Sequence, residues 1–421
     1  MTDLYPNKIP PEIPKKENSQ SKLPSATSIE SLNTNLSKPL PPGKSNGNSG
    51  QPPAIPSKPT REYSLNEIHN TKNGSVGLKN LGNTCYMNSI LQCLNATSPL
   101  THFFLSGNFR NDINEQNDLG THGKLANEYY SFLNAIWYEH QPIVSPANIK
   151  SAISNFNEEF IGSDQHDSQE FLSCILDGLH EDLNVARRKK SNSYIESKRK
   201  EHNNQEKEEE REEFDVETLR DRAWKRYIDF NYSIIVTTFQ GQYMSVLKCS
   251  QCGKISPTFN SLMYLSLPIP DNARNLKDCL DKYIEIEYLK GNDGWKCPRC
   301  NKKVDAQKQL ILSKLPDIML IQLKRFYFQG PFRDKINKYI DFPIKNLDLS
   351  PYTYKFKQKE SCYTYNLFAI SNHYGTLSGG HYTAFIKNKS NDGWIEFNDS
   401  RYSDISESKI KVCISIYVNY Y

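Results

Sequence analysis

Cys85 has the surroundings expected of a nucleophilic thiol. It follows a loop that contains Gly77 and Gly82, and apolar residues follow it at helical spacing, at positions 87, 90, 91 and 94. A cysteine at a helix N-terminus faces unpaired backbone N–H groups and the positive end of the helix dipole, which favour the nucleophilic thiolate over the thiol. The alternative is that Cys85 is simply a small buried side chain.

A base suited to such a thiol lies far along the chain, at His381. Two glycines, Gly379 and Gly380, precede it, and strand-forming residues follow it as far as position 386. This pattern predicts an imidazole held at the edge of a rigid strand, behind a flexible glycine segment. An imidazole in that position can take the proton of a thiol and return it later in the reaction.

A third polar group can orient the imidazole. A second strand-like run, 393–397, ends at Asn398 and Asp399, and residues 391–393 favour a turn. A hairpin with its turn there would return Asn398 and Asp399 towards His381. Cysteine, histidine and asparagine or aspartate in this order form the thiol version of a nucleophile–base–orienter triad.

Five motifs in this order resemble the ubiquitin-specific proteases, which are papain-like cysteine deubiquitinases. The segment 80–94 resembles the Cys box of that family, and 365–405 resembles its His box. The other three matches are Gln165–Leu172, Leu320–Phe326 and a pair of Cys-x-x-Cys motifs. The resemblance covers roughly residues 75–420 and is strongest to the endosomal, yeast-type branch.

The resemblance implies roles for five residues around the scissile bond. Cys85 would attack the carbonyl of the C-terminal glycine of ubiquitin, with His381 as the base. Asn398 matches the family's third member, but an amide adds no charge to stabilise an imidazolium, so Asp399 is an assisting or alternative partner. Asn80 matches the oxyanion-hole side chain, which would act with the backbone N–H of Cys85. A simple turn-forming role is the alternative for Asn80.

Two carboxylates and a glycine-rich segment are the predicted substrate contacts. Asp167 and Glu170 fall in the first turn of a predicted helix, where they would complement its dipole; in the family such residues also receive an arginine of the ubiquitin tail. The family's narrow cleft favours the Gly-Gly end of ubiquitin. Its walls would include His373, Gly379, Gly380 and Tyr382, although packing alone is the alternative for the two aromatic residues.

Four of the ten cysteines predict a structural metal site. They form two Cys-x-x-Cys motifs, each followed by a residue that tolerates the left-handed turn of a zinc knuckle: Cys249, Cys252, Cys297 and Cys300. Four thiolates leave no open position for catalysis, so we expect structural zinc and no catalytic cofactor. In the family, such knuckles cap the fingers that grip ubiquitin. The other cysteines besides Cys85 are predicted core residues: Cys93, Cys174, Cys279, Cys362 and Cys413.

Two alternatives exist for these motifs. Disulfides are disfavoured because the N-terminal residues show no secretory pattern. A nucleic-acid zinc ribbon is disfavoured because a chain with 24% charged residues and a net charge of +4 shows no basic stripe, and we expect no nucleic-acid partner.

Composition divides the chain into a tail and a catalytic domain. Twelve of the 23 prolines precede residue 60, so residues 1–74 are predicted to be disordered. Three Pro-x-x-Pro-x-Lys/Arg motifs in this tail are candidate SH3-domain ligands: Pro11–Lys16, Pro39–Lys44 and Pro56–Arg61. Residues 75–420 form the predicted protease domain, with a solvated, charged and partly helical insertion at 185–215 and zinc-binding fingers at 240–305.

The expected architecture is α+β and, by resemblance, papain-like. Residues 75–185 read as a helical thumb, and the chain from 230 onward reads as a β-rich palm and fingers, beginning with the strand-like run 233–239. No apolar run is long enough to span a membrane, so we expect a cytoplasmic protein, recruited to endosomes if the resemblance extends that far. A non-catalytic ubiquitin-binding scaffold and a protease for another ubiquitin-like modifier remain alternatives.

Overall fold

The computed structural model describes residues 74–188, 192–211, 214–329, 332–355, 363–376, 379–388, 391–411 and 416–420. The proline-rich tail up to residue 73, its three SH3-ligand motifs, Cys362 and Cys413 lie outside these residues. Cys93, Cys174 and Cys279 are buried, as predicted. Within the described ranges, none of the helices combines the length and apolar composition that crossing a membrane requires.

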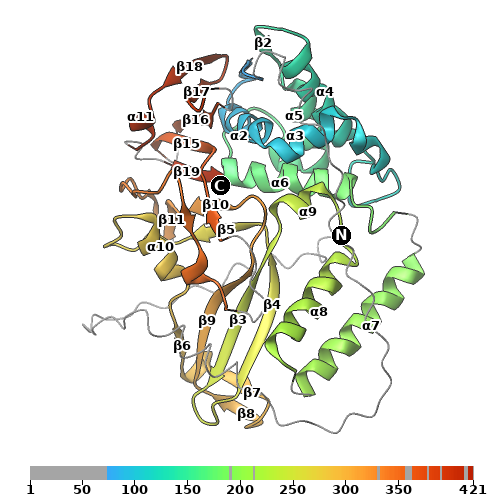
Figure 1. The fold of residues 1–421 in the computed structure, drawn as a ribbon, viewed down its shortest axis with the longest axis vertical. Helices are drawn as coiled ribbons and strands as arrows, with labels where there is room; N and C mark the ends of the chain where they lie inside the picture. The colour runs from blue at the N-terminus through green and yellow to red at the C-terminus, as the bar shows by residue number, and fades with distance from the viewer. Residues whose placement is uncertain are drawn as a thin grey trace. The chain divides into compact units, whose positions relative to one another are not determined.

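The first part of the described chain is a helical thumb, as the sequence predicts (Figure 1). Its helices each bury one apolar face in a shared core, which includes the aromatic rings of Phe104, Phe109 and Tyr129. The helices are α2 (Cys85–Ala96), α3 (Ser98–Leu105), α4 (Lys124–Tyr138), α5 (Ala147–Phe156) and α6 (Ser168–Asp182). The short strands β1 (Gly77–Leu78) and β2 (Ile143–Val144) pair in parallel beside them.

The palm is a seven-stranded sheet with a different hydrophobic core on each face. Side chains of a strand alternate between faces. Ala384 and Ile386 accordingly join the core that contains α2, whereas Phe385 joins the core under α10 (Leu276–Tyr283). In sheet order the strands are β18 (Arg401–Ile405), β17 (Trp394–Asn398), β16 (Gly379–Lys387), β15 (Ala369–Thr376), β19 (Ile416–Tyr420), β10 (Leu320–Leu323) and β5 (Tyr264–Leu267).

The fingers are a second, four-stranded sheet that projects away from the thumb (Figure 1). Its order is β4 (Ile255–Leu262), β3 (Gly241–Cys249), β9 (Ala306–Lys314) and β6 (Glu287–Leu289), and the hairpin β7 (Trp295–Cys297) and β8 (Lys302–Val304) lies at its tip. The remaining strands are β11 (Phe326–Gln329), β12 (Phe332–Lys335), β13 (Leu347–Asp348) and β14 (Thr364–Tyr365), and the last described helix is α11 (Glu407–Lys411).

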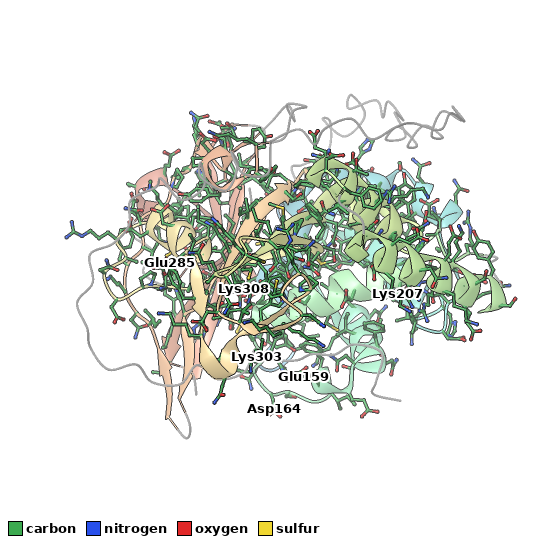
Figure 2. The ribbon with its side chains drawn as sticks, turned by 90° about the horizontal axis from the view of Figure 1, so that it is seen from below. Glu159, Asp164, Lys207, Glu285, Lys303 and Lys308 are labelled. Carbon is green, nitrogen blue, oxygen red and sulfur yellow. The ribbon has the colours of Figure 1, made fainter. Side chains whose placement is uncertain are left out.

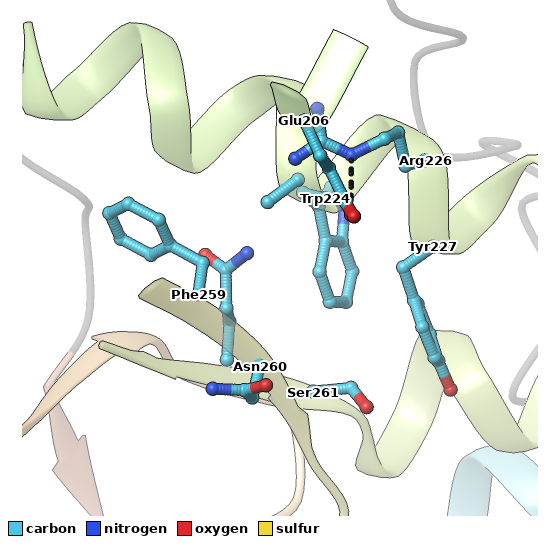
Figure 3. Close-up of a pocket in the computed structure, with 9 residues that line it drawn as sticks. Glu206, Trp224, Arg226, Tyr227, Phe259, Asn260 and Ser261 are labelled. Carbon is cyan, nitrogen blue, oxygen red and sulfur yellow. Dashed lines mark ion pairs between the residues drawn. The ribbon is translucent and has the colours of Figure 1, made fainter. Parts of the chain in front are cut away.

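The charged insertion contains α7 (Asn192–Arg211), which packs along α8 (Val216–Ile228). The contact is polar: the guanidinium of Arg226 donates two hydrogen bonds, of 2.7 and 2.9 Å, to the carboxylate of Glu209. Arg226 also pairs with Glu206 at the rim of a cavity of about 260 Å³ between α7, α8 and β4 (Figure 3). The described part of the insertion is therefore a helix that packs on α8 through charged side chains, and not only a solvated segment.

The prediction of a strand at 233–239 is wrong, because these residues form helix α9 (Ile234–Phe239) and its N-cap. Five β-branched residues in a row, at positions 234–238, favour a strand by intrinsic preference. The hydroxyl of Ser233 accepts a hydrogen bond from the backbone N–H of Val236 and caps the helix instead. Ile235 and Phe239 are buried in the thumb core, so burial outweighs the local preference for a strand.

Candidate active site

Cys85 is the first residue of α2, as predicted, and the loop before it is folded around the side chain of Asn80. The Asn80 Oδ1 atom accepts hydrogen bonds from the backbone N–H groups of Gly82 (3.1 Å) and Thr84 (3.2 Å). Gly82 has a φ of +130°, which only glycine adopts readily. The Cys85 thiol is thereby held at the N-terminus of α2, with 2% of the residue exposed.

The structure brings His381, near the start of β16, into hydrogen-bonding contact with Cys85 from the opposite lobe. Asn398 Oδ1 lies 2.7 Å from the Nε2 atom of His381, which leaves Nδ1 as the ring nitrogen available to the thiol. The pKa of His381 is raised to about 9, first by its hydrogen bond with Cys85, then by that with Asn398 and by the charges of Cys85 and Asp399. The contact between thumb and palm can therefore hold an imidazolium beside the sulfur.

The two predicted partners of the imidazole have different contacts. Asn398 binds the ring, whereas the carboxylate of Asp399 accepts hydrogen bonds from the side-chain amides of Asn80 (2.9 Å) and Asn88 (2.7 Å). The φ of Asp399 is +49°, in the left-handed region that non-glycine residues rarely adopt, and its backbone carbonyl accepts the N–H of Leu78. Asp399 thus fixes the direction of the Asn80 amide and acts on His381 only through its charge.

The segment that leads to His381 is a strand rather than a free glycine loop. Gly379 and Gly380 pair with β15, and a Cβ atom at Gly380 would lie 2.1 Å from the His373 Nε2 atom. The side-chain amide of Gln165, just before α6, joins the thumb to β16: it donates to the carbonyl oxygen of Gly380 (3.0 Å) and accepts from its N–H (3.3 Å). Glycine is therefore needed here for close approach.

His373 and Tyr382 are buried behind this segment, with ring centroids 4.6 Å apart. Burial raises the pKa of Tyr382, whose hydroxyl bonds to Ser168 at the start of α6. The pKa of His373 is lowered to about 4 by burial and then by the nearby Lys335 and His381, so its ring is neutral. The ammonium of Lys335 donates to the carbonyl of His373 (3.0 Å), which ties β12 to β15.

The predicted acidic pair lies at the start of α6. The Asp167 side chain accepts the backbone N–H of Gln169 at 2.7 Å, so it does cap the helix. Glu170 is exposed, yet desolvation and then the charges of Asp167 and Glu159 raise its pKa to about 7. Glu159 lies with Asp164 in the segment before α6 (Figure 2). A crowded acidic site of this kind gains from a cationic ligand.

The four predicted ligand cysteines meet at the tip of the fingers. Their sulfur atoms all lie within 4.8 Å of one another, and the Cys252–Cys297 and Cys249–Cys300 sulfurs are 3.6 and 3.9 Å apart. Four metal–sulfur bonds of about 2.3 Å in a tetrahedron separate sulfurs by about 3.8 Å, whereas a disulfide needs about 2.05 Å. The residues after each pair, Gly253 and Asn301, have φ values of +68° and +51°, as the knuckle prediction requires. The cluster therefore fits a four-coordinate metal ion.

A family model described as ubiquitin carboxyl-terminal hydrolase matches residues 76–421. The chain belongs to the ubiquitin carboxyl-terminal hydrolase family. Similar family members include ubiquitin carboxyl-terminal hydrolase 4 of Vanderwaltozyma polyspora, 33% identical over 401 residues, and that of Saccharomyces cerevisiae, 34% identical over 373 residues. These alignments cover 88% and 82% of this chain but only 44% and 39% of the yeast proteins. Human ubiquitin carboxyl-terminal hydrolase 2 is 33% identical over 343 residues, which are 80% of this chain and 53% of that protein.

A solved structure of this hydrolase type has the same fold. The Ubp8-containing SAGA DUB module bound to monoubiquitin superposes with a TM-score of 0.62 at 25% identity, over 83% of this chain and 69% of that chain. The family and the α+β, papain-like architecture with thumb, palm and fingers are thus confirmed, and the likeness to yeast hydrolases agrees with the predicted branch.

Three further residues of the site are absent from the sequence-based prediction. Asn88 had a signal, because it lies one helical turn after Cys85 and so on the same face of α2. Gln165 belongs to a recognised motif, but nothing in that motif indicates its contact with Gly380. Lys335 carries no local signal at all, since its partners lie on another strand.

Proposed function

We propose that this chain is a cysteine-type deubiquitinase that hydrolyses peptide and isopeptide bonds at the C-terminal glycine of ubiquitin. The observation that carries the proposal is the contact between Cys85 of the thumb and His381 of the palm, with Asn398 on the far side of the imidazole. Membership of the ubiquitin carboxyl-terminal hydrolase family supports ubiquitin as the substrate.

The reaction begins with a thiolate–imidazolium pair. The Cys85 sulfur adds to the glycine carbonyl carbon, and the resulting oxyanion collapses with cleavage of the C–N bond. The His381 imidazolium gives its proton to the departing amine, which leaves a thioester on Cys85. His381 then takes a proton from a water molecule that attacks the thioester, and collapse of this second intermediate expels the Cys85 thiolate and so restores the thiolate–imidazolium pair. The carboxylic acid of ubiquitin that is released gives its proton to solvent.

Asn80 and the backbone N–H of Cys85 stabilise the oxyanion in this scheme. The Oδ1 atom of Asn80 is occupied by loop N–H groups, and one hydrogen of its Nδ2 atom is occupied by Asp399, which leaves the second hydrogen for the substrate. Asp399 is therefore a positioning residue. A preorganised donor of this kind is typically worth about 3–4 kcal/mol in the transition state.

The ubiquitin tail enters along the segment that begins β16. Gly379 and Gly380 offer close backbone approach, with His373 and Tyr382 as the wall behind them. At the start of α6, Asp167 and Glu170 receive an arginine side chain of the tail; a guanidinium there favours the ionised form of Glu170, whose pKa is otherwise raised to about 7. The Gln165 side chain joins the start of α6 to Gly380 at the start of β16, so it must move aside when the tail of ubiquitin passes between them.

The finger tip holds zinc through Cys249, Cys252, Cys297 and Cys300. The donor set of four thiols supports zinc, which favours tetrahedral thiolate coordination. Such an ion is structural: it closes the ends of the β3–β4 and β7–β8 hairpins and so keeps the fingers in a form that can hold the globular part of ubiquitin.

Hydrolysis of fluorogenic C-terminal amides tests the proposal. The chain should release coumarin from ubiquitin aminomethylcoumarin, and Cys85→Ser should abolish release. The same amide made from another ubiquitin-like modifier tests the alternative substrate class. Binding of ubiquitin without turnover by the wild-type chain would instead make it a scaffold, and turnover that survives Cys85→Ser would assign the nucleophile elsewhere.

A further inference from the structure

The palm sheet carries a groove on the side of the catalytic residues that lies away from the fingers. It has a volume of about 540 Å³ and is lined by residues of β17, β18 and the turn between them: Glu396, Asn398, Ser400, Arg401, Tyr402 and Ser403. Asn398 joins this groove to the reaction centre, because its side-chain oxygen is bonded to the Nε2 atom of His381.

The order of strands determines which side of the scissile bond this groove serves. In the sheet, β16 carries His381, the strands from β15 to β5 lie on one side of it, and β17 and β18 lie on the other (Figure 1). In the proposed function, the fingers hold the globular part of ubiquitin, and its tail passes between the start of α6 and the start of β16. The departing amine must therefore lie on the side of β17 and β18.

The groove is also adjacent to the loop that carries the nucleophile. A Cβ atom at Gly77 would lie 2.2 Å from the backbone oxygen of Ser400, so β1 passes directly against the turn between β17 and β18. The backbone N–H of Leu78 donates to the carbonyl of Asp399 at 2.8 Å. The groove thus begins where the Cys85 loop and the His381 hairpin meet.

The groove has the chemistry of a site for an extended peptide that carries a lysine. The ring of Tyr402 is 50% exposed but stacks on buried Phe397, with centroids 5.7 Å apart, so it forms a fixed apolar surface that suits the methylene stem of a lysine. Residues 401–404 of β18 are exposed, and β18 is the outermost strand among the described strands of its sheet. An extended segment can pair with such an edge through backbone hydrogen bonds.

We propose that this groove binds the lysine-bearing segment of the substrate from which ubiquitin is removed, and that it selects among such segments. The inference rests on the proposed deubiquitinase function, which it extends from the ubiquitin side of the bond to the acceptor side. Tyr402 contacts the lysine stem, β18 pairs with the backbone of the segment, and Arg401, exposed at the start of β18, favours acidic neighbours of the lysine.

Two substrates that differ only in the leaving group test this inference. One is ubiquitin aminomethylcoumarin, and the other is ubiquitin joined to the Nε atom of a lysine within a short labelled peptide. Tyr402→Ala should lower kcat/KM for the peptide conjugate by about tenfold relative to that for the coumarin amide, as expected for loss of an aromatic contact. Tyr402→Phe should retain the wild-type ratio, because the ring and its stacking remain. Arg401→Glu should shift preference from peptides with acidic flanks to peptides with basic flanks.

Tyr194→Ala is the matched control, since Tyr194 is a comparably exposed tyrosine (44%) on α7. It should leave the ratio of the two activities unchanged. A wild-type ratio in Tyr402→Ala, whether both activities fall together or neither changes, would overturn the inference and leave the deubiquitinase proposal standing. A wild-type chain that hydrolyses neither substrate would overturn the proposed function and the inference together.

Discussion

The junction between thumb and palm and the tip of the fingers are held together in different ways. At the junction, α2 and strands β15–β17 share one continuous hydrophobic core, and the hydroxyls of Ser89 and Ser371 meet across it at 2.9 Å. At the finger tip, the only buried apolar cluster among the described residues consists of Cys249, Cys297 and Val304, with Cys252, Trp295 and Cys300 partly buried against it. The first region is built by burial, and the second needs its ion.

Because of this difference, we expect the junction to determine catalysis and the finger tip to determine the binding of ubiquitin. Burial of apolar surface contributes roughly 25 cal/mol per Å² to the free energy of folding. At the junction, the shared core gives the rigid frame that positions Cys85 against His381. A bound structural zinc ion contributes about 10–16 kcal/mol, but only to the hairpins that it joins. Damage at the junction should therefore reduce kcat, and damage at the finger tip should raise KM.

The largest effect should follow replacement of the nucleophile. Cys85→Ser removes the thiolate and should lower kcat for ubiquitin aminomethylcoumarin by roughly 10,000-fold or more. The side chain is isosteric and buried, so the melting temperature and the affinity for ubiquitin should change little. Stopped-flow turnover measures kcat, and calorimetric titration measures the affinity for ubiquitin. A variant that lost ubiquitin binding together with activity would contradict the separation of catalysis from ubiquitin binding.

Asp399→Ala should have the next largest effect, although Asp399 does not bond the imidazole. Removing the carboxylate frees the amides of Asn80 and Asn88, so the oxyanion donor loses its orientation. We expect kcat to fall roughly 100- to 1000-fold with little change in KM. Asp281→Ala, at an exposed aspartate of α10 paired with Lys277, is the control and should retain full activity. Full activity of Asp399→Ala would show that Asn80 needs no such support.

Loss of the metal should act mainly on KM. Cys297→Ser removes one of four ligands and should raise the KM for ubiquitin substrates by about tenfold or more, while kcat changes less. The purified wild-type chain should contain about one zinc per molecule, and chelation should make residues 240–305 sensitive to limited proteolysis. A metal-free preparation with unchanged KM and protease-resistant fingers would remove the distinction between the two regions.

A smaller effect is expected at the entrance of the tail channel. The carboxyl of Glu170, with its pKa raised to about 7, ionises as the pH rises through that value, so KM should fall over the same range. Glu170→Gln should flatten this dependence and raise KM at alkaline pH by roughly two- to fivefold, the range of an exposed ion pair. A pH profile of KM that is identical in the variant would assign the arginine of the tail to another site.

The pH dependence of the catalytic pair gives the smallest predicted shift. Because the pKa of His381 is raised to about 9, the imidazolium is present below that pH and is lost above it, so kcat/KM should fall on the alkaline side. For the same reason, the stability that the raised pKa of His381 contributes is complete below about pH 6.5 and disappears as the pH rises through about 9. Asn398→Ala removes one hydrogen bond to the ring and should move the alkaline limb down by roughly 0.7 of a pH unit.

The parts of the site that follow from short sequence motifs could be predicted. The contacts that join distant segments of the chain could not. The helix that starts at Cys85, the strand after His381 and the two knuckles each follow from a few consecutive residues. The hydrogen bonds of Asp399 join positions 319 and 311 residues apart, so no pattern in the sequence indicates them. The mistaken strand at 233–239 has the same origin, because its helical form depends on the thumb core around it.

Some predictions lie beyond the described contacts. The SH3-ligand motifs of the tail and a cytoplasmic, endosome-associated location stay predictions.

Labelling with a ubiquitin that carries a C-terminal electrophile tests the central claim most directly, because the adduct can be located by peptide mass spectrometry. The chain contains ten cysteines, so the other nine serve as internal controls for reactivity. The account predicts a single adduct, on Cys85, that is lost in Cys85→Ala and strongly slowed in His381→Ala. An adduct on any other cysteine, or labelling of Cys85 at an undiminished rate without His381, would contradict the pairing of these two residues between thumb and palm.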